Sequence, residues 1–235
     1  MKKVIQLILA VALSVTAMYG AEPSATKLLD KMIAAYGGAE NLKQLNDYKQ
    51  SWHIETKVSD TNGSDLREVM IPSYLYTHLS YSHKSEVRIL EGDKGVKKFG
   101  QKTIEAKGPM LDAMKLQLMR LFHPLELKKR VKNIKLSLTP THYMFSLDEN
   151  GLTAEYFVSK KSFLIQKVIG RLQIGGQKME FLTLYQDYKR VNGVMVPHKE
   201  VKYAGEVNTA IMRLQVTQFK HKNKNSKFVK LNINS

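Results

Sequence analysis

The stretch Ser162–Phe219, SFLIQKVIGRLQIGGQKMEFLTLYQDYKRVNGVMVPHKEVKYAGEVNTAIMRLQVTQF, decides the fold of this chain. It consists of four runs rich in Val, Ile, Leu, Phe and Tyr, separated by Gly175-Gly176, Asn192-Gly193 and Gly205. Apolar runs joined by turns of this kind are typical of an antiparallel meander. The runs are longer than the ~5–6 residues of an average strand, and we therefore expect a large curved sheet that wraps around something.

Helices and further strands precede this meander. Apolar residues recur on one face of Ser24–Tyr36, and Gly37-Gly38 provides a stop, so this segment is predicted to be a helix. Helical patterns also cover Ala39–Leu45, Met110–Phe122 and Leu125–Arg130. The other predicted strands are Tyr48–Val58, Leu66–Ile71, Tyr74–Tyr81, Glu86–Leu90, Gly95–Phe99, Ile134–Leu138, Tyr143–Leu147 and Ala154–Val158. This order indicates one α+β domain, in which a continuous antiparallel sheet has helices packed on one face.

The N-terminus has the pattern of a bacterial secretory signal peptide. Lys2 and Lys3 precede an apolar run over Val4–Val15, and small residues follow at positions 17, 20 and 21. We assign residues 1–20 to a signal peptide, with cleavage between 17 and 21, and residues 22–235 to a single domain. An uncleaved membrane anchor is the alternative, although the run is short for a span of ~20 residues.

The amino-acid composition limits the possible binding partners and the cellular location of the protein. Lys and Arg outnumber Asp and Glu by 37 to 21, which gives a net charge of +16. Such a charge points to nucleic acid or to an anionic membrane surface, and export argues against nucleic acid. Cysteine is absent, which excludes disulfides, a thiolate nucleophile and the lipidated N-terminal cysteine of a lipoprotein. We expect a soluble periplasmic protein without a lipid anchor.

Three segments resemble the LolA/LolB-like outer-membrane lipoprotein-sorting superfamily. Ala34–Leu42 (AAYGGAENL) is similar to the helix end that opens these proteins, and Phe157–Ile165 (FVSKKSFLI) resembles one of their strand–turn–strand units. The most specific segment is Tyr185–Pro197 (YQDYKRVNGVMVP), which is similar to a hairpin of the form DYxxVxGVxxP. Together the three segments span nearly all of the chain that follows the predicted signal peptide.

The resemblance implies a half-open β-barrel, that is, a strongly curved antiparallel sheet with helices packed on its concave face as a lid. It also implies an apolar cavity for acyl chains and a Gram-negative periplasm. Because the chain has no cysteine, it departs from the anchored, LolB-like members. The partners implied are lipid or the acyl chains of a lipoprotein, together with an inner-membrane transporter or an outer-membrane acceptor.

The helix Met110–Phe122 is the candidate gate of that cavity. Its apolar face comprises Leu111, Met114, Leu118, Leu121 and Phe122. Methionine is flexible and polarisable, which suits irregular apolar partners such as acyl chains. An ordinary core helix carries the same pattern, and the residues alone do not separate the two interpretations.

The candidate cavity lining on the strands follows from the alternation of side chains between the two faces of a sheet. The three sets are Leu164, Val168 and Leu172; Leu182 and Leu184; and Met212, Leu214 and Val216. We predict that all three sets face the concave side. They are equally typical of an ordinary core, and a role as cavity lining requires an opening.

No catalytic or metal-binding constellation is recognisable in the sequence. The 7 histidines are scattered without an HExxH or facial-triad spacing, and no GxSxG nucleophile motif occurs. Asp148-Glu149 stands beside Asn150-Gly151 and is typical of a turn. We therefore expect no catalytic residues, no metal, no cofactor and no enzymatic activity.

The sequence favours a periplasmic carrier or binding protein for lipid or acylated cargo, which takes part in outer-membrane lipoprotein sorting or lipid transport. A non-catalytic envelope adaptor that binds a protein partner is the alternative, and a hydrolase is the least favoured class. Two basic segments, Lys128–Lys132 and Lys220–Lys230, are either solvated faces or sites of weak contact with an anionic membrane surface.

Overall fold

The computed structural model describes residues 23–59 and 61–219. The predicted signal peptide, residues 1–20, and the basic segment Lys220–Lys230 lie outside the described residues. Among the helices of residues 23–59 and 61–219, none combines the length and the apolar character that crossing a membrane requires.

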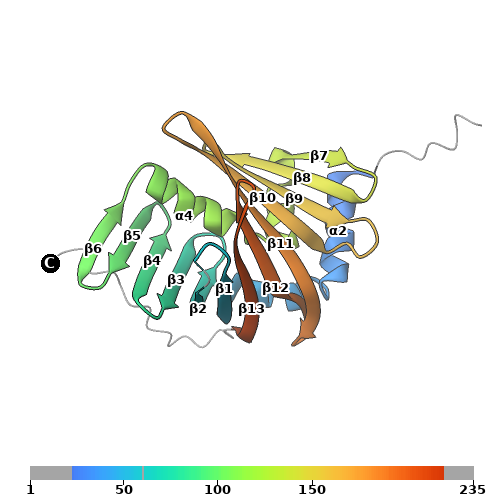
Figure 1. Ribbon diagram of the computed structural model, residues 1–235. Coiled ribbons are helices and arrows are strands. Elements are labelled where there is room, and N and C mark those ends of the chain that lie inside the picture. The colour runs from blue at the N-terminus through green and yellow to red at the C-terminus, as the bar shows by residue number, and fades with distance from the viewer. Residues whose placement is uncertain (1–22, 60, 220–235) are drawn as a thin grey trace, which may run out of the picture.

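The described residues contain 13 strands in one antiparallel sheet (Figure 1). They are β1 (Asp47–Thr56), β2 (Asn62–Met70), β3 (Tyr74–Tyr81), β4 (Lys84–Glu91), β5 (Lys94–Phe99), β6 (Lys102–Ala106), β7 (Ile134–Leu138), β8 (His142–Glu149), β9 (Leu152–Ser159), β10 (Ile165–Ile174), β11 (Gln177–Val191), β12 (Val194–Ala204) and β13 (Val207–Phe219). Their spatial order is β6-β5-β4-β3-β2-β1-β13-β12-β11-β10-β9-β8-β7.

This order describes two meanders joined in the middle of the sheet. The first runs outward from β1 to β6, and the second runs from β7 back to β13, which pairs with β1. The edge strands β6 and β7 do not pair with each other within the described residues. The sheet is therefore curved and open rather than a closed barrel.

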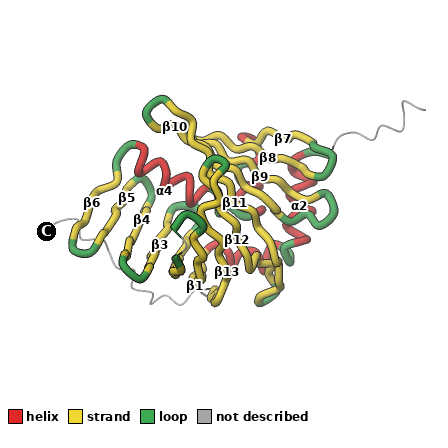
Figure 2. Tube along the Cα trace, in the orientation of Figure 1, coloured by secondary structure: helices red, strands yellow, loops and turns green. Residues whose placement is uncertain are grey.

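Four α-helices accompany the sheet in the described residues: α2 (Ala25–Ala35), α3 (Ala39–Leu42), α4 (Pro109–Met119) and α5 (Pro124–Lys129). α4 follows Gly108, whose φ of 51° suits glycine, and begins with a proline, which is tolerated where the amide has no helical partner. The helix lies on the concave side of the sheet, between the two meanders (Figure 1 and Figure 2). It contacts β9 and β10 of one meander and β3, β4 and β5 of the other.

Two glycines allow α4 and the residue after it to lie directly on the sheet. A Cβ atom added to Gly95 in β5 would be 3.0 Å from Leu111 Cδ1. A Cβ atom added to Gly170 in β10 would be 2.5 Å from Arg120 Cδ. Interiors are close-packed, so side chains at either position would push the helix away. α4 and the residue after it thus contact both meanders, and at these two glycines their side chains lie close to the sheet backbone.

The main core lies between α2, α4 and the concave face of the sheet. Its buried side chains include Leu28 and Met32 of α2, Leu118 of α4 and Tyr156 of β9. The sequence prediction of an α+β fold is confirmed: the antiparallel sheet is strongly curved and half open, with helices on its concave face.

Most predicted elements have nearly the predicted limits, and Tyr74–Tyr81, Ile134–Leu138 and Val207–Phe219 coincide with strands. β6 was absent from the predicted strands. Its sequence, KTIEA, has one large apolar side chain, Ile104, because β6 is an edge strand that buries little. Such a segment lacks the hydrophobic periodicity on which strand prediction rests.

Candidate functional site

A cavity of about 80 Å³ lies between the C-terminal end of α4 and the concave face of the sheet. Part of its lining is apolar, with Phe122 and Val168 as examples, and part is charged, with Arg67 and Glu200. Cavities that hold small molecules usually measure ~300–1,000 Å³. With α4 in this position the cavity is therefore too small for an acyl chain.

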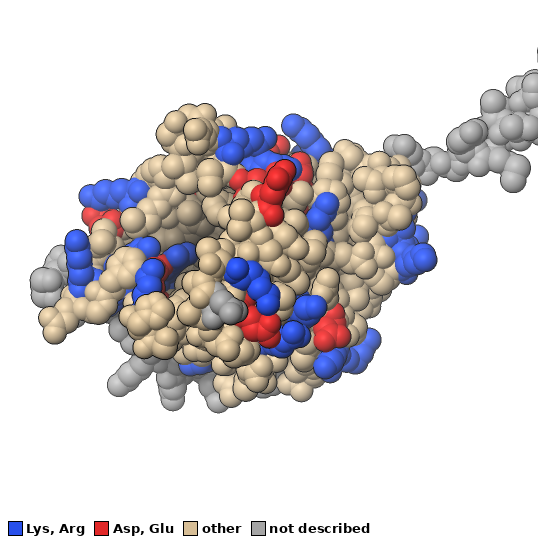
Figure 3. Space-filling model, in the orientation of Figure 1, with Lys and Arg blue, Asp and Glu red and all other residues tan. Residues whose placement is uncertain are grey.

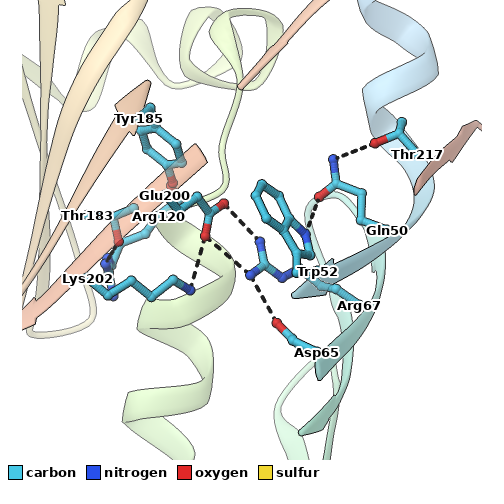
Figure 4. Close-up of polar contacts among 10 residues, drawn as sticks. All are labelled: Gln50, Trp52, Asp65, Arg67, Arg120, Thr183, Tyr185, Glu200, Lys202 and Thr217. Atoms are coloured by element: carbon cyan, nitrogen blue, oxygen red, sulfur yellow. Dashed lines mark hydrogen bonds and ion pairs between the residues drawn. The ribbon is translucent and has the colours of Figure 1, made fainter. Parts of the chain in front are cut away.

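A buried ion cluster forms the charged part of the lining (Figure 4). Arg67 of β2 is only 1% exposed. Its guanidinium donates to Asp65 Oδ2 at 3.1 Å and to Glu200 Oε1 at 3.2 Å. Its cationic carbon lies 5.2 Å from the ring centre of Trp52, within cation–π range. Because β2 and β12 belong to opposite sides of the β1–β13 pair, this cluster ties the two meanders together.

Lys202 is the second cation that contacts Glu200. Its Nζ lies 3.2 Å from Glu200 Oε2. Burial by itself would raise the pKa of Glu200, but the charges of Arg67 and Lys202 outweigh burial and lower that pKa to about 2. Glu200 is therefore a carboxylate with cations on both oxygens.

Arg120, the residue that ends α4, is the third cation of the cluster. Its guanidinium donates to Thr183 Oγ1, and its Nε has no partner within the described residues. None of the ion pairs found in residues 23–59 and 61–219 includes Arg120. Burial lowers the pKa of Arg120, which reflects a charge removed from water without an opposite charge at contact distance.

The C-terminal end of α4 is anchored by two tyrosine hydroxyls. Tyr156 Oη donates to the carbonyl oxygen of Met119 at 2.6 Å, and Tyr185 Oη donates to that of Arg120 at 3.3 Å. The last carbonyls of a helix have no partner within the helix, so these bonds stabilise its end. Burial raises the pKa of both tyrosines, which therefore remain protonated donors.

The rest of α4 is held by the apolar packing of Leu111 and Met114 against the sheet and by an exposed ion pair near its middle. Lys115 Nζ lies 2.6 Å from Asp93 Oδ1, and the Asp93 side chain is 92% exposed. Exposed ion pairs contribute only ~0–1 kcal/mol. Met110, near the start of the helix, is also exposed. The space-filling view shows this side of the molecule hollowed between the two meanders (Figure 3).

His123 closes the cavity beyond the end of α4. Its Nε2 lies 2.9 Å from Asn46 Oδ1, and its Nδ1 has no partner within the described residues. Burial lowers the pKa of His123 to about 4. The imidazole is therefore neutral at physiological pH.

The predicted gate residues of α4 divide into two groups. Leu121 and Phe122, which follow the helix, line the cavity. Leu111, Met114 and Leu118 belong to or pack against the main core instead. The helix thus buries its predicted apolar face, and its C-terminal end reaches the cavity.

The strand residues that were predicted to line the cavity are also divided. Val168 lines it directly, and Leu172 lies in the main core. Leu164 packs against the buried cluster around Tyr36, and Met212 and Leu214 pack around Trp52. These five residues lie on the inner side of the fold.

Three predicted lining residues face the other way. Thr183 and Tyr185 of β11 point into the site, so Leu182 and Leu184, which alternate with them, lie on the convex face. The prediction of a concave position for these two leucines was wrong, because both sets of side chains on β11 are largely apolar.

Val216 faces away from the cavity for a different reason. The pairing of β13 with β1 shifts register between Ser51 and Trp52, so that Val216 pairs with Ser51 and Leu214 with Trp52. Such a bulge changes which residues face inward. Val216 is 49% exposed, and its predicted place in the cavity was also wrong.

The sequence patterns considered above do not predict the charged cluster, yet the sequence contains a signal for part of it. Val69 of β2 is fully buried, and counting back by two from Val69 gives Arg67 and Asp65. Counting forward by two from the buried Val196 of β12 gives His198 and then Glu200. Charged residues in phase with buried valines indicate an internal ion pair.

The described part of the basic segment Lys128–Lys132 is largely paired. Lys128 Nζ lies 2.5 Å from Asp30 Oδ1, and Lys129 and Arg130 both contact Glu126. On the face in Figure 3, Lys and Arg are dispersed and interspersed with Asp and Glu. These pairings favour a solvated face over a concentrated basic patch.

Comparison with known proteins identifies the fold. No protein-family model matches the sequence. No curated protein matches it either. Among solved structures, a LolA superfamily protein from Nitrosomonas europaea is similar, with a TM-score of 0.55 and 9% identity over 85% of this chain and 94% of that chain.

Two further solved structures resemble the chain more distantly. An outer-membrane lipoprotein-sorting protein domain from Vibrio parahaemolyticus gives a TM-score of 0.48 at 10% identity, over 85% of this chain and 96% of that chain. A DUF1329 family protein from Desulfovibrio piger gives 0.47 at 7% identity, over 85% and 95%. The LolA-like fold implied by the sequence motifs is confirmed by the Nitrosomonas structure.

Proposed function

We propose that this protein is a periplasmic carrier or binding protein for lipid or acylated cargo, with α4 as the lid of the cavity. The observation that carries the proposal is the position of α4. An apolar helix lies across the open side of a curved sheet and covers a partly apolar cavity of about 80 Å³. The Nitrosomonas structure, a LolA superfamily protein, supports the fold, and the resemblance of the sequence segments to the lipoprotein-sorting superfamily supports a role in lipoprotein sorting or lipid transport.

The lid opens by a movement of its N-terminal half. The C-terminal end of α4 is anchored by hydrogen bonds to Met119 and Arg120, whereas the N-terminal half packs on the sheet through apolar side chains and the exposed Lys115–Asp93 pair lies near the middle of the helix. Displacement of Leu111 and Met114 from β5 exposes apolar surface, which an acyl chain then covers. Each buried methylene contributes about 0.8 kcal/mol, so a chain of ordinary length compensates for the contacts that the lid loses.

The experiment is native mass spectrometry of the mature protein purified without detergent, followed by titration of the delipidated protein with a fluorescent fatty acid. We expect co-purifying lipid and saturable probe binding. Lys115→Gln should accelerate probe uptake up to about fivefold, because it removes one contact of the lid. Lys43→Gln, which removes the exposed pair with Glu40, is the matched control. A clean mass without bound lipid, together with no probe binding, contradicts the proposal.

An envelope adaptor is the second candidate, and the convex face of β10–β13 favours it. Ile169, Leu182, Leu184, Val201 and Ile211 are neighbours through strand pairing on that face. An apolar face of a sheet is suited to a protein partner. A stable protein complex with an empty cavity, observed in the same mass spectrometry experiment, supports the adaptor over the carrier.

A further inference from the structure

The cluster beside the cavity has more cations than carboxylates. Three cations, Arg67, Arg120 and Lys202, lie near two carboxylates, Asp65 and Glu200. Arg67 contacts both carboxylates, and Lys202 contacts Glu200. Arg120 therefore remains the cation without a carboxylate at contact distance in the described residues. Arg120 is partly buried, and a charge that is drawn from water without a counter-charge is unfavourable, so this arrangement favours one more negative charge.

Arg120 stands at the junction of two recesses. The cavity of about 80 Å³ lies on one side. A smaller recess of about 20 Å³ lies on the other, and Gln117, Thr183 and Lys202 contribute to its lining. A space of ~10–15 Å³ holds one water molecule, so the smaller recess has room for one or two oxygen atoms of an anionic group. Arg120, Leu121 and Tyr185 line both spaces.

The donors around the small recess suit an oxygen anion. The Arg120 guanidinium has five N–H groups, and the structure uses it for the bond to Thr183. The ammonium of Lys202 and the amide of Gln117 line the same recess. The carboxylate of Glu200 also lines it, but Arg67 and Lys202 already occupy both of its oxygens. An anionic group in the recess would therefore lie beside Arg120.

The larger cavity supplies the opposite chemistry. Leu121 and Phe122 follow Arg120 in the chain, and Ile165 and Val168 of β10 face them across the cavity. Arg120, which has no carboxylate at contact distance, lies next to this apolar wall. The combination fits a molecule with an anionic head and an apolar chain.

We propose that the ligand is an amphiphile with an anionic head, a carboxylate or a phosphate monoester, whose charge pairs with Arg120 while its chain lies along the apolar wall. This inference rests on the proposed carrier function and adds the chemical class of the headgroup. Arg120 follows the C-terminal end of α4, so the head binds at the anchored end of the helix and the chain lies along Leu121 and Phe122, which come next in the sequence.

The test is calorimetric titration of delipidated protein with matched ligands, above the pKa of a carboxylic acid. Decanoate and decyl phosphate carry a chain and a negative charge, methyl decanoate carries the chain alone, and acetate and inorganic phosphate carry the charge alone. We expect the two charged chains to bind about 10- to 100-fold more tightly than methyl decanoate, the effect of a hydrogen bond to a charged group. Whichever charged chain binds more tightly identifies the head.

Variants at Arg120 separate the ligand role from a structural role. Arg120→Gln should abolish the preference for charged chains and leave the affinity for methyl decanoate within a few-fold of wild type. Arg120→Lys should retain part of the preference. Arg213→Gln is the control, because Arg213 lies on the convex face and pairs there with Glu55. Thermal unfolding confirms that each variant is folded.

The outcomes distinguish the two proposals. If charged and neutral chains bind equally, the headgroup inference is wrong and the carrier function stands. If phosphate or acetate alone binds as tightly as its decyl counterpart, the recess is an anion site and the amphiphile is excluded. If no chain binds, the carrier function fails, and the headgroup inference fails with it.

Discussion

Two neighbouring strands of the second meander, β10 and β11, present opposite kinds of side chain to the interior. β10 directs Val168 and Leu172 inward, as a half-buried strand of an ordinary core does. β11 directs Thr183 and Tyr185 inward and places Leu182 and Leu184 on the convex face. The difference marks the boundary of the site: next to Arg67 and Arg120 the inward side chains change from Val168 of β10 to Thr183 and Tyr185 of β11 and to Glu200 and Lys202 of β12.

A polar interior of this kind requires compensation for every charge. Burial of an ion costs several kcal/mol unless another charge compensates it. In the cluster Arg67 and Glu200 pair with each other, and we propose that Arg120 pairs with a ligand. We infer that the change of side-chain polarity from β10 to β11 serves binding rather than stability.

Loss of the central carboxylate should have the largest effect. Glu200→Gln leaves Lys202 without its carboxylate and Arg67 with Asp65 alone. Removal of one partner from a buried ion pair costs ~3–5 kcal/mol, and we expect the free energy of unfolding to fall by about that amount. Urea denaturation measures it. The exposed Glu40→Gln, at 84% side-chain exposure, is the matched control and should change stability by less than ~0.5 kcal/mol. Equal effects of both changes contradict the account of the cluster.

The same carboxylate should give the protein an acid-sensitive stability. The pKa of Glu200 is lowered from 4.5 to about 2 in the folded state. A lowered pKa stabilises the fold above the unfolded pKa, and this contribution is lost as the pH falls from 4.5 to about 2. The loss should reach about 3 kcal/mol. Urea denaturation over this pH range checks it, and the slope should be smaller in Glu200→Gln. An unchanged slope assigns the acid sensitivity to other groups.

The close contact between Gly170 and Arg120 gives a test with a smaller effect. Gly170→Val places side-chain atoms where the stem of Arg120 lies, 2.5 Å from the added Cβ. Overpacking typically costs ~1–3 kcal/mol. Arg120→Ala in the same chain should relieve the clash, so the double variant should be less destabilised than the sum of the single ones. Additive effects in the double-mutant cycle contradict the contact.

The last comparison, which includes the smallest expected change in stability, is between one residue of β10 and one of β11. Val168→Thr places a hydroxyl in the fully buried interior and should cost ~1–3 kcal/mol. Leu184→Thr on the convex face should cost less than ~1 kcal/mol, because that side chain remains partly exposed. Thermal and urea unfolding of the two variants provide the comparison. A larger effect at Leu184 indicates that the convex face is a buried interface.

The sequence predicted the fold better than the site because the two rest on different information. Turn residues and apolar runs are local, and they fixed most strand limits from Tyr74–Tyr81 to Val207–Phe219. The pairing of β1 with β13 joins residues such as Tyr48 and Phe219, which lie far apart in the chain. No local pattern encodes that pairing.

The direction of side chains was predictable only where one set was clearly polar. In β11 both alternating sets contain large apolar side chains, Phe181 and Tyr185 against Leu182 and Leu184, so period-two analysis could not choose a face. In β13 a bulge interrupted the alternation before Val216. The contact between Arg67 and Glu200 depends on the sheet order, and it therefore became visible only in three dimensions.

The most direct test of the account uses Trp52, the only tryptophan of the chain. Trp52 lines the cavity and stacks near Arg67. A fatty acid brominated along its chain quenches tryptophan fluorescence at short range, so its binding should quench Trp52 saturably. Unlabelled decanoate should restore the emission. The account predicts this quenching at the same midpoint as calorimetric binding. Calorimetric binding of the brominated chain without any loss of Trp52 emission would place the ligand outside the cavity and contradict the account.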